Sequence, residues 1–210
     1  MLRILIADDH ALVRKGLKQI LLEEYPSAIV EEVNDGEGVI KKSISDEWDI
    51  IISDLSMPGR SGLDVLKQVK QNLPKLPVLI LSIHPEEQYA IRVLKAGAAG
   101  YLSKDVATEE LVEAVQRVLQ GRKYISPSIA EKIAEYLGQD STDKAPYEFL
   151  SNREFDVFTR LASGKTVSEI ADQLSLSATT VSTYRSRILE KMNMRTNAEL
   201  TRYALENKLI

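Results

Sequence analysis

Residues 49–54 read Asp-Ile-Ile-Ile-Ser-Asp, an apolar run of strand length that ends on an acid. Residues 77–83, Pro-Val-Leu-Ile-Leu-Ser-Ile, form a second run that is almost wholly apolar. Strands without a polar face are typical of a parallel sheet that helices cover on both sides. The two runs therefore predict the centre of a parallel sheet in an α/β domain.

Further strands and helices are expected around these two runs. Strand candidates lie at 2–8, 28–33 and 99–103, and apolar residues recur at helical spacing over 11–24, 36–45, 61–71, 86–96 and 107–120. Five strand–helix units predict a doubly wound, five-stranded parallel sheet of the flavodoxin-like kind. Such a sheet places its site at the carboxyl ends of its strands. This rule nominates residues 8–10, 54–58, 82–84 and 103–105.

The pattern changes after residue 122. Ser126-Pro127 supplies the start signal of a linker helix, and the polar stretch 139–146 is typical of a flexible linker. From residue 148 onward only helical patterns occur, at about 152–163, 167–174, 178–192 and 197–207. We therefore predict a first domain at 1–122, a linker helix and flexible linker at 123–147, and an all-α four-helix domain at 148–210.

Composition limits the classes of function. The longest apolar runs are about five residues, well short of the ~20 that span a bilayer, so we expect no membrane partner. The chain has no cysteine, which excludes thiolate metal sites and is consistent with a cytoplasmic protein. Residues 1–122 hold 15 Lys and Arg against 19 Asp and Glu, whereas residues 149–210 hold 9 against 7. The sign of this asymmetry suits a C-terminal domain that meets phosphates.

Acidic side chains gather where the predicted strands end. Asp8 and Asp9 follow the first strand, Asp54 ends the third, and Lys104 follows the fifth. Carboxylates crowded at one edge repel each other unless a cation neutralises them, and Mg²⁺ is a hard, oxygen-seeking candidate. With the metal bound, a carboxylate can attack a phosphoryl group and form an acyl phosphate, whose charge Lys104 would offset. The sequence therefore predicts phosphoryl chemistry at this edge.

Residues 1–122 resemble the receiver domain of two-component signalling. The resemblance rests on Asp8-Asp9, on Asp54 followed by Met57-Pro58-Gly59, on Ser82, and on Tyr101-Leu102-Ser103-Lys104-Asp105. It implies that Asp54 is the phosphoacceptor. It also implies that Asp9, Asp54 and the backbone carbonyl of Ser56 bind Mg²⁺, while Asp8 acts mostly through water.

The same resemblance assigns the remaining receiver residues. It implies that Lys104 pairs with the phosphoryl group, that Ser82 moves to form a hydrogen bond with it, and that Tyr101 rotates inward in step. Ser56 and His84 stand where receivers vary and where the dephosphorylation rate is tuned, although a solvated loop residue would also explain His84. Asp105 replaces the proline that follows the lysine in many receivers.

One face of segment 178–192 is small, polar and basic. Apolar residues form a stripe on one side, and the opposite side carries Ser182, Thr183, Ser186 and Arg187. Small side chains permit close approach to the major groove, and arginine bonds guanine edges or phosphates. A solvated helix face would show the same composition. The short helix and three-residue turn that precede the segment favour a DNA reader.

Residues 148–210 are similar to the LuxR-type helix-turn-helix output domain of the NarL/FixJ family. The matching residues spread over all four predicted helices: Leu150, Arg153-Glu154, Leu161-Ala162, Gly164, Glu169-Ile170-Ala171, Leu174, Leu176-Ser177, Thr180-Val181, Ile188, Lys191-Met192 and Leu209-Ile210. The resemblance implies a recognition helix at 178–192 and a dimerisation surface on the helix from Asn197. Bases would face Ser182, Thr183 and Ser186. Phosphates would face Arg185, Arg187 and Lys191.

Together the two resemblances predict a phosphorylation-dependent transcriptional regulator rather than an enzyme. A sensor histidine kinase or a small acyl phosphate would phosphorylate Asp54, and a homodimer would then bind double-stranded promoter DNA. Two other classes fit less well. An aspartyl-phosphate hydrolase would carry a second acid where Ser56 stands, and a flavodoxin-like FMN protein would need hydroxyls in place of Asp8-Asp9-His10. A protein-interaction or RNA-binding helical module is the alternative for the last domain.

Overall fold

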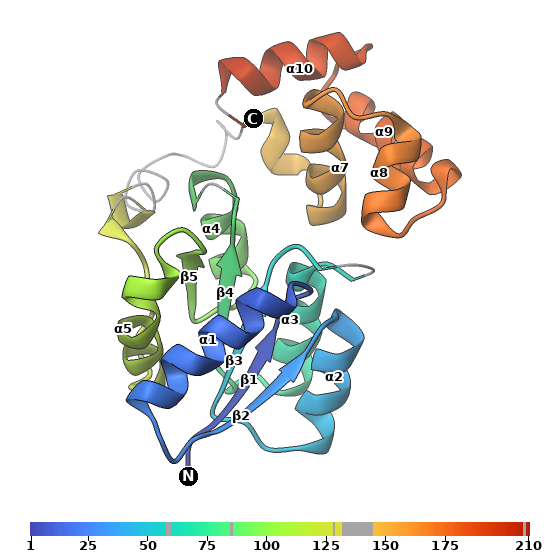
Figure 1. Ribbon diagram of the computed structural model, residues 1–210. Helices are drawn as coiled ribbons and strands as arrows, with labels where there is room; N and C mark the ends of the chain where they lie inside the picture. Colours follow the sequence, from blue (N-terminus) through green and yellow to red (C-terminus); the bar gives the residue numbers. More distant parts are fainter. Residues whose placement is uncertain (58–59, 85, 128, 132–144, 208) are drawn as a thin grey trace. The chain divides into compact units, whose positions relative to one another are not determined.

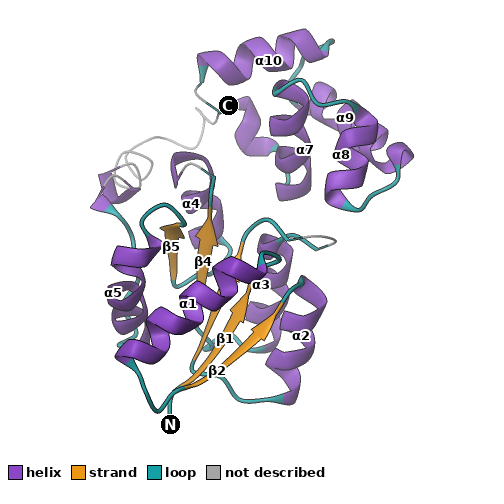
Figure 2. Cartoon of the chain, viewed as in Figure 1, coloured by secondary structure: helices purple, strands orange, loops and turns teal. Residues whose placement is uncertain are grey.

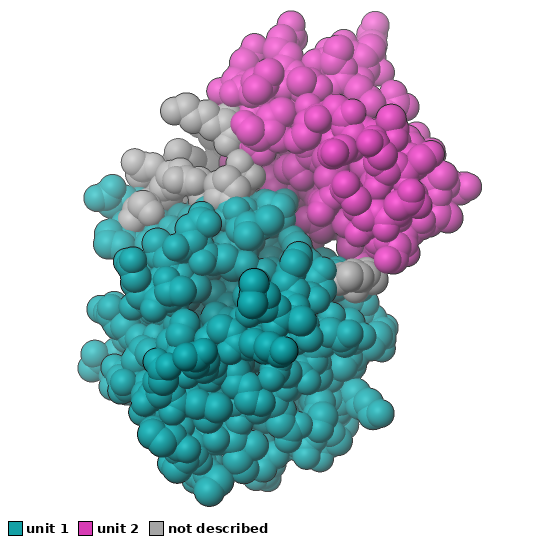
Figure 3. All heavy atoms as spheres, in the orientation of Figure 1, with its two compact units in different colours: residues 1–137 teal, residues 138–210 magenta. Residues whose placement is uncertain are grey.

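The computed structural model describes residues 1–57, 60–84, 86–127, 129–131, 145–207 and 209–210. The chain divides into two compact units, Met1–Leu137 and Gly138–Ile210, which are coloured separately in Figure 3. The predicted flexible linker and the end of the predicted linker helix fall largely on residues 132–144, outside the described residues. Of that helix, residues 129–131 are described and helical, and Oγ of Ser126 accepts a hydrogen bond from the Ile129 amide at 3.4 Å.

The first unit contains one parallel five-stranded sheet (Figures 1 and 2). Its strands are β1 (Arg3–Ala7), β2 (Ile29–Val33), β3 (Ile50–Asp54), β4 (Val78–Ser82) and β5 (Gly100–Ser103). They lie in the order β2-β1-β3-β4-β5, so the order reverses beside β1. In register, Ala7 pairs with Ser53 and Asp54 with Leu81. The carboxyl ends of these strands therefore meet at one edge of the sheet.

Five helices cover both faces of this sheet: α1 (Ala11–Glu24), α2 (Gly36–Ser45), α3 (Gly62–Asn72), α4 (Glu86–Lys95) and α5 (Ala107–Leu119). One core joins Ile50 and Ile52 of β3 to Leu17 of α1 and Leu111 of α5. Ile51, which points to the other face, is also fully buried. A strand buried on both faces explains why 49–54 has no polar side, and burial of each such side chain contributes about 1.5–3 kcal/mol. The predicted doubly wound fold is confirmed.

The second unit is helical. A short 3-10 helix, η1 (Pro146–Phe149), precedes α7 (Asn152–Ala162), α8 (Val167–Leu174), α9 (Ala178–Lys191) and α10 (Asn197–Glu206). Each of the four α-helices begins on a hydroxyl side chain that accepts a hydrogen bond from the third residue of the helix, at Ser151, Thr166, Ser177 and Thr196. The helical domain is as predicted. Helix η1 was not predicted, because Pro146, which starts it, was assigned to the linker.

Aromatic and aliphatic side chains hold this unit together. Phe155 and Phe158 of α7 are fully buried, with their ring centroids 5.9 Å apart. Val181 and Ile188 of α9 and Leu200 of α10 are fully buried as well. Within the described residues of the two units, no helix has the length and hydropathy needed to cross a bilayer.

Candidate functional site

Asp8 follows β1, Asp54 ends β3 and Lys104 follows β5, so the three side chains meet at the carboxyl edge of the sheet. Nζ of Lys104 lies 2.7 Å from Oδ2 of Asp8 and 2.8 Å from Oδ2 of Asp54. Asp8 is 0% exposed and Asp54 is 2% exposed. One ammonium group thus bridges two buried carboxylates, and the neighbouring Asp9 adds a third acid, so negative charge remains in excess.

Burial and neighbouring charges shift the pKa values of Asp54 and Lys104. Burial raises the pKa of Asp54, and the hydrogen bond from Lys104 does not fully reverse that effect. Burial alone would lower the pKa of Lys104, but the hydrogen bonds and charges of Asp54 and Asp8 raise it above its ordinary value. The Lys104 ammonium is therefore well stabilised while the Asp54 carboxylate is not, which is the condition under which a further cation binds favourably.

Four side chains at this edge can offer atoms to a cation. One atom from each of Asp8, Asp9, His10 and Asp54 lies within 4.8 Å of the others. Oδ2 of Asp8 and Oδ1 of Asp9 are buried, and they lie at ion-pair distance from Lys104 and His10, respectively. Carboxylate oxygens of this kind suit a hard divalent ion such as Mg²⁺.

His10 belongs to the nominated range 8–10, but the sequence analysis gave it no role of its own. Its Nδ1 lies 2.8 Å from Oδ1 of Asp9 and 3.3 Å from Oδ1 of Asp8, and its side chain is 67% exposed. Its amide donates to Oδ1 of Asp8 at 2.7 Å. The available signal was its position directly after the acidic pair, in the turn that starts α1. Imidazole is a poor ligand for Mg²⁺, so His10 serves here as a partner of the acids.

A hydrogen bond links the loops after β3 and β4. Oγ of Ser56 lies 2.8 Å from Nε2 of His84, whose ring stacks on Tyr89 with centroids 4.7 Å apart. The Ser56 amide donates to Oδ1 of Asp54 at 3.2 Å. A continuous path of short contacts therefore runs from the Asp54 carboxylate to the His84 ring. Of the sequence motif after Asp54, Pro58 and Gly59 lie outside the described residues.

Ser82 and Tyr101 both attach to the backbone of His84. Oγ of Ser82 accepts a hydrogen bond from the His84 amide at 3.0 Å, and the Tyr101 hydroxyl donates to the His84 carbonyl at 2.7 Å. Ser82 is fully buried and Tyr101 is 2% exposed. The two residues that were expected to act together therefore both form hydrogen bonds with the backbone of a single residue, His84.

Helix α9 of the second unit presents small polar residues to solvent. Its exposed side chains include Ser182, Thr183, Ser186 and Arg187. The hydroxyls of Thr183 and Ser186 donate to helix carbonyls one turn earlier, at 3.0 and 3.2 Å. Each oxygen still has a lone pair for a further donor. This face thus combines three short hydroxyl side chains with one long basic side chain, Arg187.

Two of the side chains expected to meet phosphates have protein partners in the structure. Nε of Arg185 donates to Oδ1 of Asn197 at 2.7 Å. Nζ of Lys191 lies 2.6 Å from Oε2 of Glu154, which is 3% exposed. Burial would raise the pKa of Glu154, but hydrogen bonds from Lys191 and Ser151 hold it below its ordinary value. Both contacts anchor α9 to neighbouring helices.

Two family descriptions match separate parts of the chain. Residues 4–116 match the response regulator receiver domain, and residues 148–204 match the bacterial regulatory proteins of the luxR family. The chain is a response regulator of the LuxR-type helix-turn-helix family. The two matched ranges of this response regulator fall in the two units of the fold, one in each, and the matched families are the predicted ones.

Known response regulators align with this one over nearly their whole length. UvrY of Escherichia coli (strain K12) is 35% identical over 209 residues, which cover 100% of this chain and 96% of UvrY. GacA of Pseudomonas aeruginosa is 33% identical over 210 residues, with coverage of 100% and 98%. RcsB of Salmonella enterica serovar Typhimurium, solved bound to the promoter rprA with the phosphomimetic BeF3⁻, has a TM-score of 0.65 and 26% identity. The match covers 97% of this chain and 98% of the RcsB chain.

The structure brings four of the predicted site residues of this response regulator together. Asp8, Asp9, Asp54 and Lys104 converge at the carboxyl edge. Ser56 contacts Asp54 through its amide, whereas the expected ligand role of its carbonyl stays a prediction. Sequence reasoning did not find the pairing of Ser56 with His84, or that of Lys191 with Glu154, because neither pair is close in sequence.

Proposed function

We propose that this response regulator accepts a phosphoryl group on Asp54 and that the modification controls promoter binding by its C-terminal domain. The observation that carries the proposal is the Lys104 ammonium group, 2.7 Å from Asp8 and 2.8 Å from Asp54 at the carboxyl edge. This places a fixed positive charge beside a nucleophilic carboxylate. The chemistry is confined to the gain and loss of one phosphoryl group, as in a regulator rather than a metabolic enzyme.

Asp9, Asp54 and the Ser56 carbonyl would hold Mg²⁺, with Asp8 acting mostly through water. The ion would supply positive charge that offsets the carboxylates and the phosphoryl oxygens. A carboxylate oxygen of Asp54 attacks phosphorus, the bond from phosphorus to the donor breaks, and the donor leaves with the electron pair. Lys104 stays protonated, consistent with its raised pKa, and its charge stabilises the transferred group. A sensor histidine kinase or a small acyl phosphate is the donor.

Ser82 and Tyr101 would carry the signal away from Asp54. Donation of the Ser82 hydroxyl to a phosphoryl oxygen would change its hydrogen bond with the His84 amide, now 3.0 Å. Tyr101 is tied to the same residue through the His84 carbonyl. Movement at Ser82 is therefore coupled to Tyr101 through one backbone turn, which acts as a two-state element.

Helix α9 would lie in the major groove of double-stranded DNA. Ser182, Thr183 and Ser186 would face bases, and Arg187 would be the main phosphate contact. Arg185 and Lys191 would meet phosphates only by sharing or leaving Asn197 and Glu154. Phosphorylation would favour a homodimer formed through the helix from Asn197, which would place two recognition helices about one turn of DNA apart. With these partners, the protein would act in the cytoplasm.

Labelling with radioactive acetyl phosphate tests the proposal. The full chain should incorporate acid-stable label in the presence of Mg²⁺, and EDTA should prevent it. The variant Asp54→Asn should incorporate none, whereas Asp172→Asn, which removes an exposed carboxylate of α8, should label normally. Label on the Asp54→Asn variant would refute the assignment of the phosphoacceptor.

A further inference from the structure

The amino-terminal edge of the receiver sheet carries a pocket that the phosphoryl chemistry does not use. It lies where β3, β4 and β5 begin, since its lining includes Asp49, Pro77 and Ala99, the residues directly before these strands. Because the strands are parallel, this edge is opposite the one that holds Asp54. The pocket has a volume of about 390 Å³, within the range of small-ligand sites.

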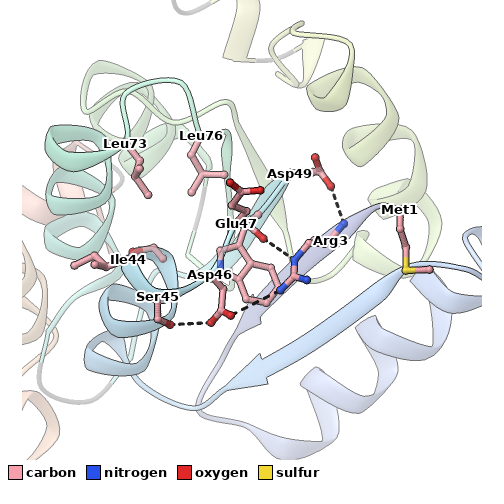
Figure 4. A pocket seen from close by; sticks show the side chains of 11 residues that line it. Met1, Arg3, Ile44, Ser45, Asp46, Glu47, Asp49, Leu73 and Leu76 are labelled. Atoms are coloured by element: carbon pink, nitrogen blue, oxygen red, sulfur yellow. Dashed lines mark hydrogen bonds and ion pairs between the residues drawn. The ribbon is translucent and has the colours of Figure 1, made fainter.

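Four basic side chains surround this pocket, namely Lys70, Lys75, Arg122 and Lys123. In the described part of the chain, none of the four forms an ion pair with an acid. Asp49 is the one acid among the described lining residues, and its Oδ2 already accepts a hydrogen bond from the Arg3 amide at 2.7 Å. Figure 4 draws this contact in a view of another pocket that Asp49 also lines. The lining therefore carries a net charge of +3 in a chain whose net charge is −4.

Backbone carbonyls hold two of these ammonium groups in place. Nζ of Lys70 lies 2.5 Å from the Leu76 carbonyl oxygen and 3.3 Å from that of Pro74. Nζ of Lys123 lies 2.5 Å from the Ala98 carbonyl oxygen. An ammonium group has three protons to donate. Lys70 thus keeps one proton, and Lys123 keeps two, for an additional acceptor.

The positive charge of each restrained lysine is destabilised. Burial lowers the pKa of both Lys70 and Lys123, and the charge of Lys123 lowers that of Lys70 further. An anion between them would reverse this effect, since an opposite charge within a few ångströms favours the charged form. Phosphate oxygens are suitable acceptors because each carries negative charge and several lone pairs.

The floor of the pocket is apolar. Pro77, Ala99 and Leu119 line it, and all three keep exposed surface, 37% in the case of Leu119. Gly97 keeps the turn before β5 close to Lys70: its φ is 99°, and an added Cβ would lie 3.3 Å from Cγ of Lys70. A simple inorganic anion would use the cations and leave this floor in water. A ligand with an anionic end and a flat apolar end would use both.

We propose that this pocket binds a nucleoside polyphosphate, with its phosphates on the four basic side chains and its base on the apolar floor. The net charge of +3 matches a di- or triphosphate better than a single phosphate. Binding here does not involve Asp54 or the acids of the opposite edge. The site is thus a second input to the receiver, separate from phosphorylation.

Isothermal titration calorimetry of the full chain tests this proposal, with ATP, GTP, inorganic triphosphate and inorganic phosphate as probes. EDTA is included so that no ligand reaches the acids through a metal. A nucleotide should bind more tightly than inorganic triphosphate. Lys75→Gln combined with Arg122→Gln should weaken nucleotide binding at least tenfold, because both exposed side chains line the pocket. The matched control, Lys15→Gln combined with Lys41→Gln, makes the same change in net charge at exposed positions elsewhere.

Three results would overturn the proposal. Equal weakening in the control pair would mean general attraction by surface charge. Inorganic triphosphate binding as tightly as the nucleotides would mean that the apolar floor has no role. Absence of heat with every probe at millimolar concentration would mean that the pocket is not a ligand site. Binding by the Asp54→Asn variant should equal that of the unaltered chain, so this test is independent of phosphorylation.

Discussion

Nζ of Lys191 lies 2.6 Å from Oε2 of Glu154, a buried carboxylate near the start of helix α7. The same oxygen accepts a hydrogen bond from the Ser151 amide at 2.7 Å, which completes the capping box of that helix. The ion pair thus ties the last turn of α9, the proposed recognition helix, to the first turn of α7. We therefore expect Lys191 to act on DNA binding chiefly by positioning α9, and exposed Arg187 to meet a phosphate.

The salt dependence of DNA binding distinguishes these two roles. Arg187→Ala should lower affinity and reduce the slope of log K against log salt by about 0.9, the value for one lost phosphate contact. Lys191→Met should lower affinity with the slope unchanged, because it alters helix placement and releases no counterion. Fluorescence anisotropy with promoter DNA over a range of salt measures both. A slope reduced equally by Lys191→Met would show that Lys191 also contacts a phosphate.

The pH dependence of stability tests the Glu154–Lys191 pair. Hydrogen bonds hold the pKa of Glu154 below its ordinary value of 4.5 in the folded state. Below that pH the unfolded state binds the extra proton, so the contribution to stability is full above about pH 4.5 and is lost as the pH falls through the folded pKa. Glu154→Gln should cost about 1.5–3 kcal/mol near neutral pH, toward the lower end because the Lys191 side chain is 41% exposed.

Urea denaturation at several pH values measures this cost. The difference between Glu154→Gln and the unaltered chain should shrink as the pH falls below about 4. Glu190→Gln, at an exposed position of α9, is the control and should show little change at any pH. A difference that stays constant down to acid pH would argue against the ion pair.

Mg²⁺ should stabilise the receiver through the acids at the carboxyl edge. A ligand that binds only the folded state raises its stability by RT ln(1 + [L]/Kd), so the melting temperature should rise with Mg²⁺ concentration. Asp9→Asn removes a carboxylate whose Oδ1 is buried. The variant should shift the Mg²⁺ titration by about tenfold or more. Differential scanning fluorimetry records the curves, and an unchanged titration would exclude Asp9 as a ligand.

The hydrogen bond between Ser56 and His84 should control the lifetime of phosphorylated Asp54. It joins the two loops that flank the acceptor, at 2.8 Å between Oγ and Nε2. Ser56→Ala would loosen these loops and admit water, so dephosphorylation should accelerate about 2- to 10-fold, the equivalent of a hydrogen bond of about 0.5–1.5 kcal/mol. Release of phosphate from the labelled chain after removal of the donor gives the rate. A slower release would mean that Ser56 helps water to react instead.

Local sequence patterns predict the sheet and the acidic site well, for a physical reason. The run 49–54 is apolar because it is buried on both faces, and a parallel sheet brings the ends of its strands to one edge, where Asp8, Asp54 and Lys104 meet. Side-chain pairing between segments that are distant in the sequence is harder to predict. The pairing of Glu154 with Lys191 depends on how α7 and α9 cross, and no local pattern encodes that angle.

Reduction of the phosphorylated chain with borohydride tests the central claim most directly. Borohydride converts an aspartyl phosphate to homoserine, which peptide mass spectrometry locates in the sequence. After treatment with acetyl phosphate and Mg²⁺, homoserine should be found at position 54 and should be absent when Mg²⁺ is withheld. An unchanged aspartate at position 54, or homoserine at another position, would contradict the account.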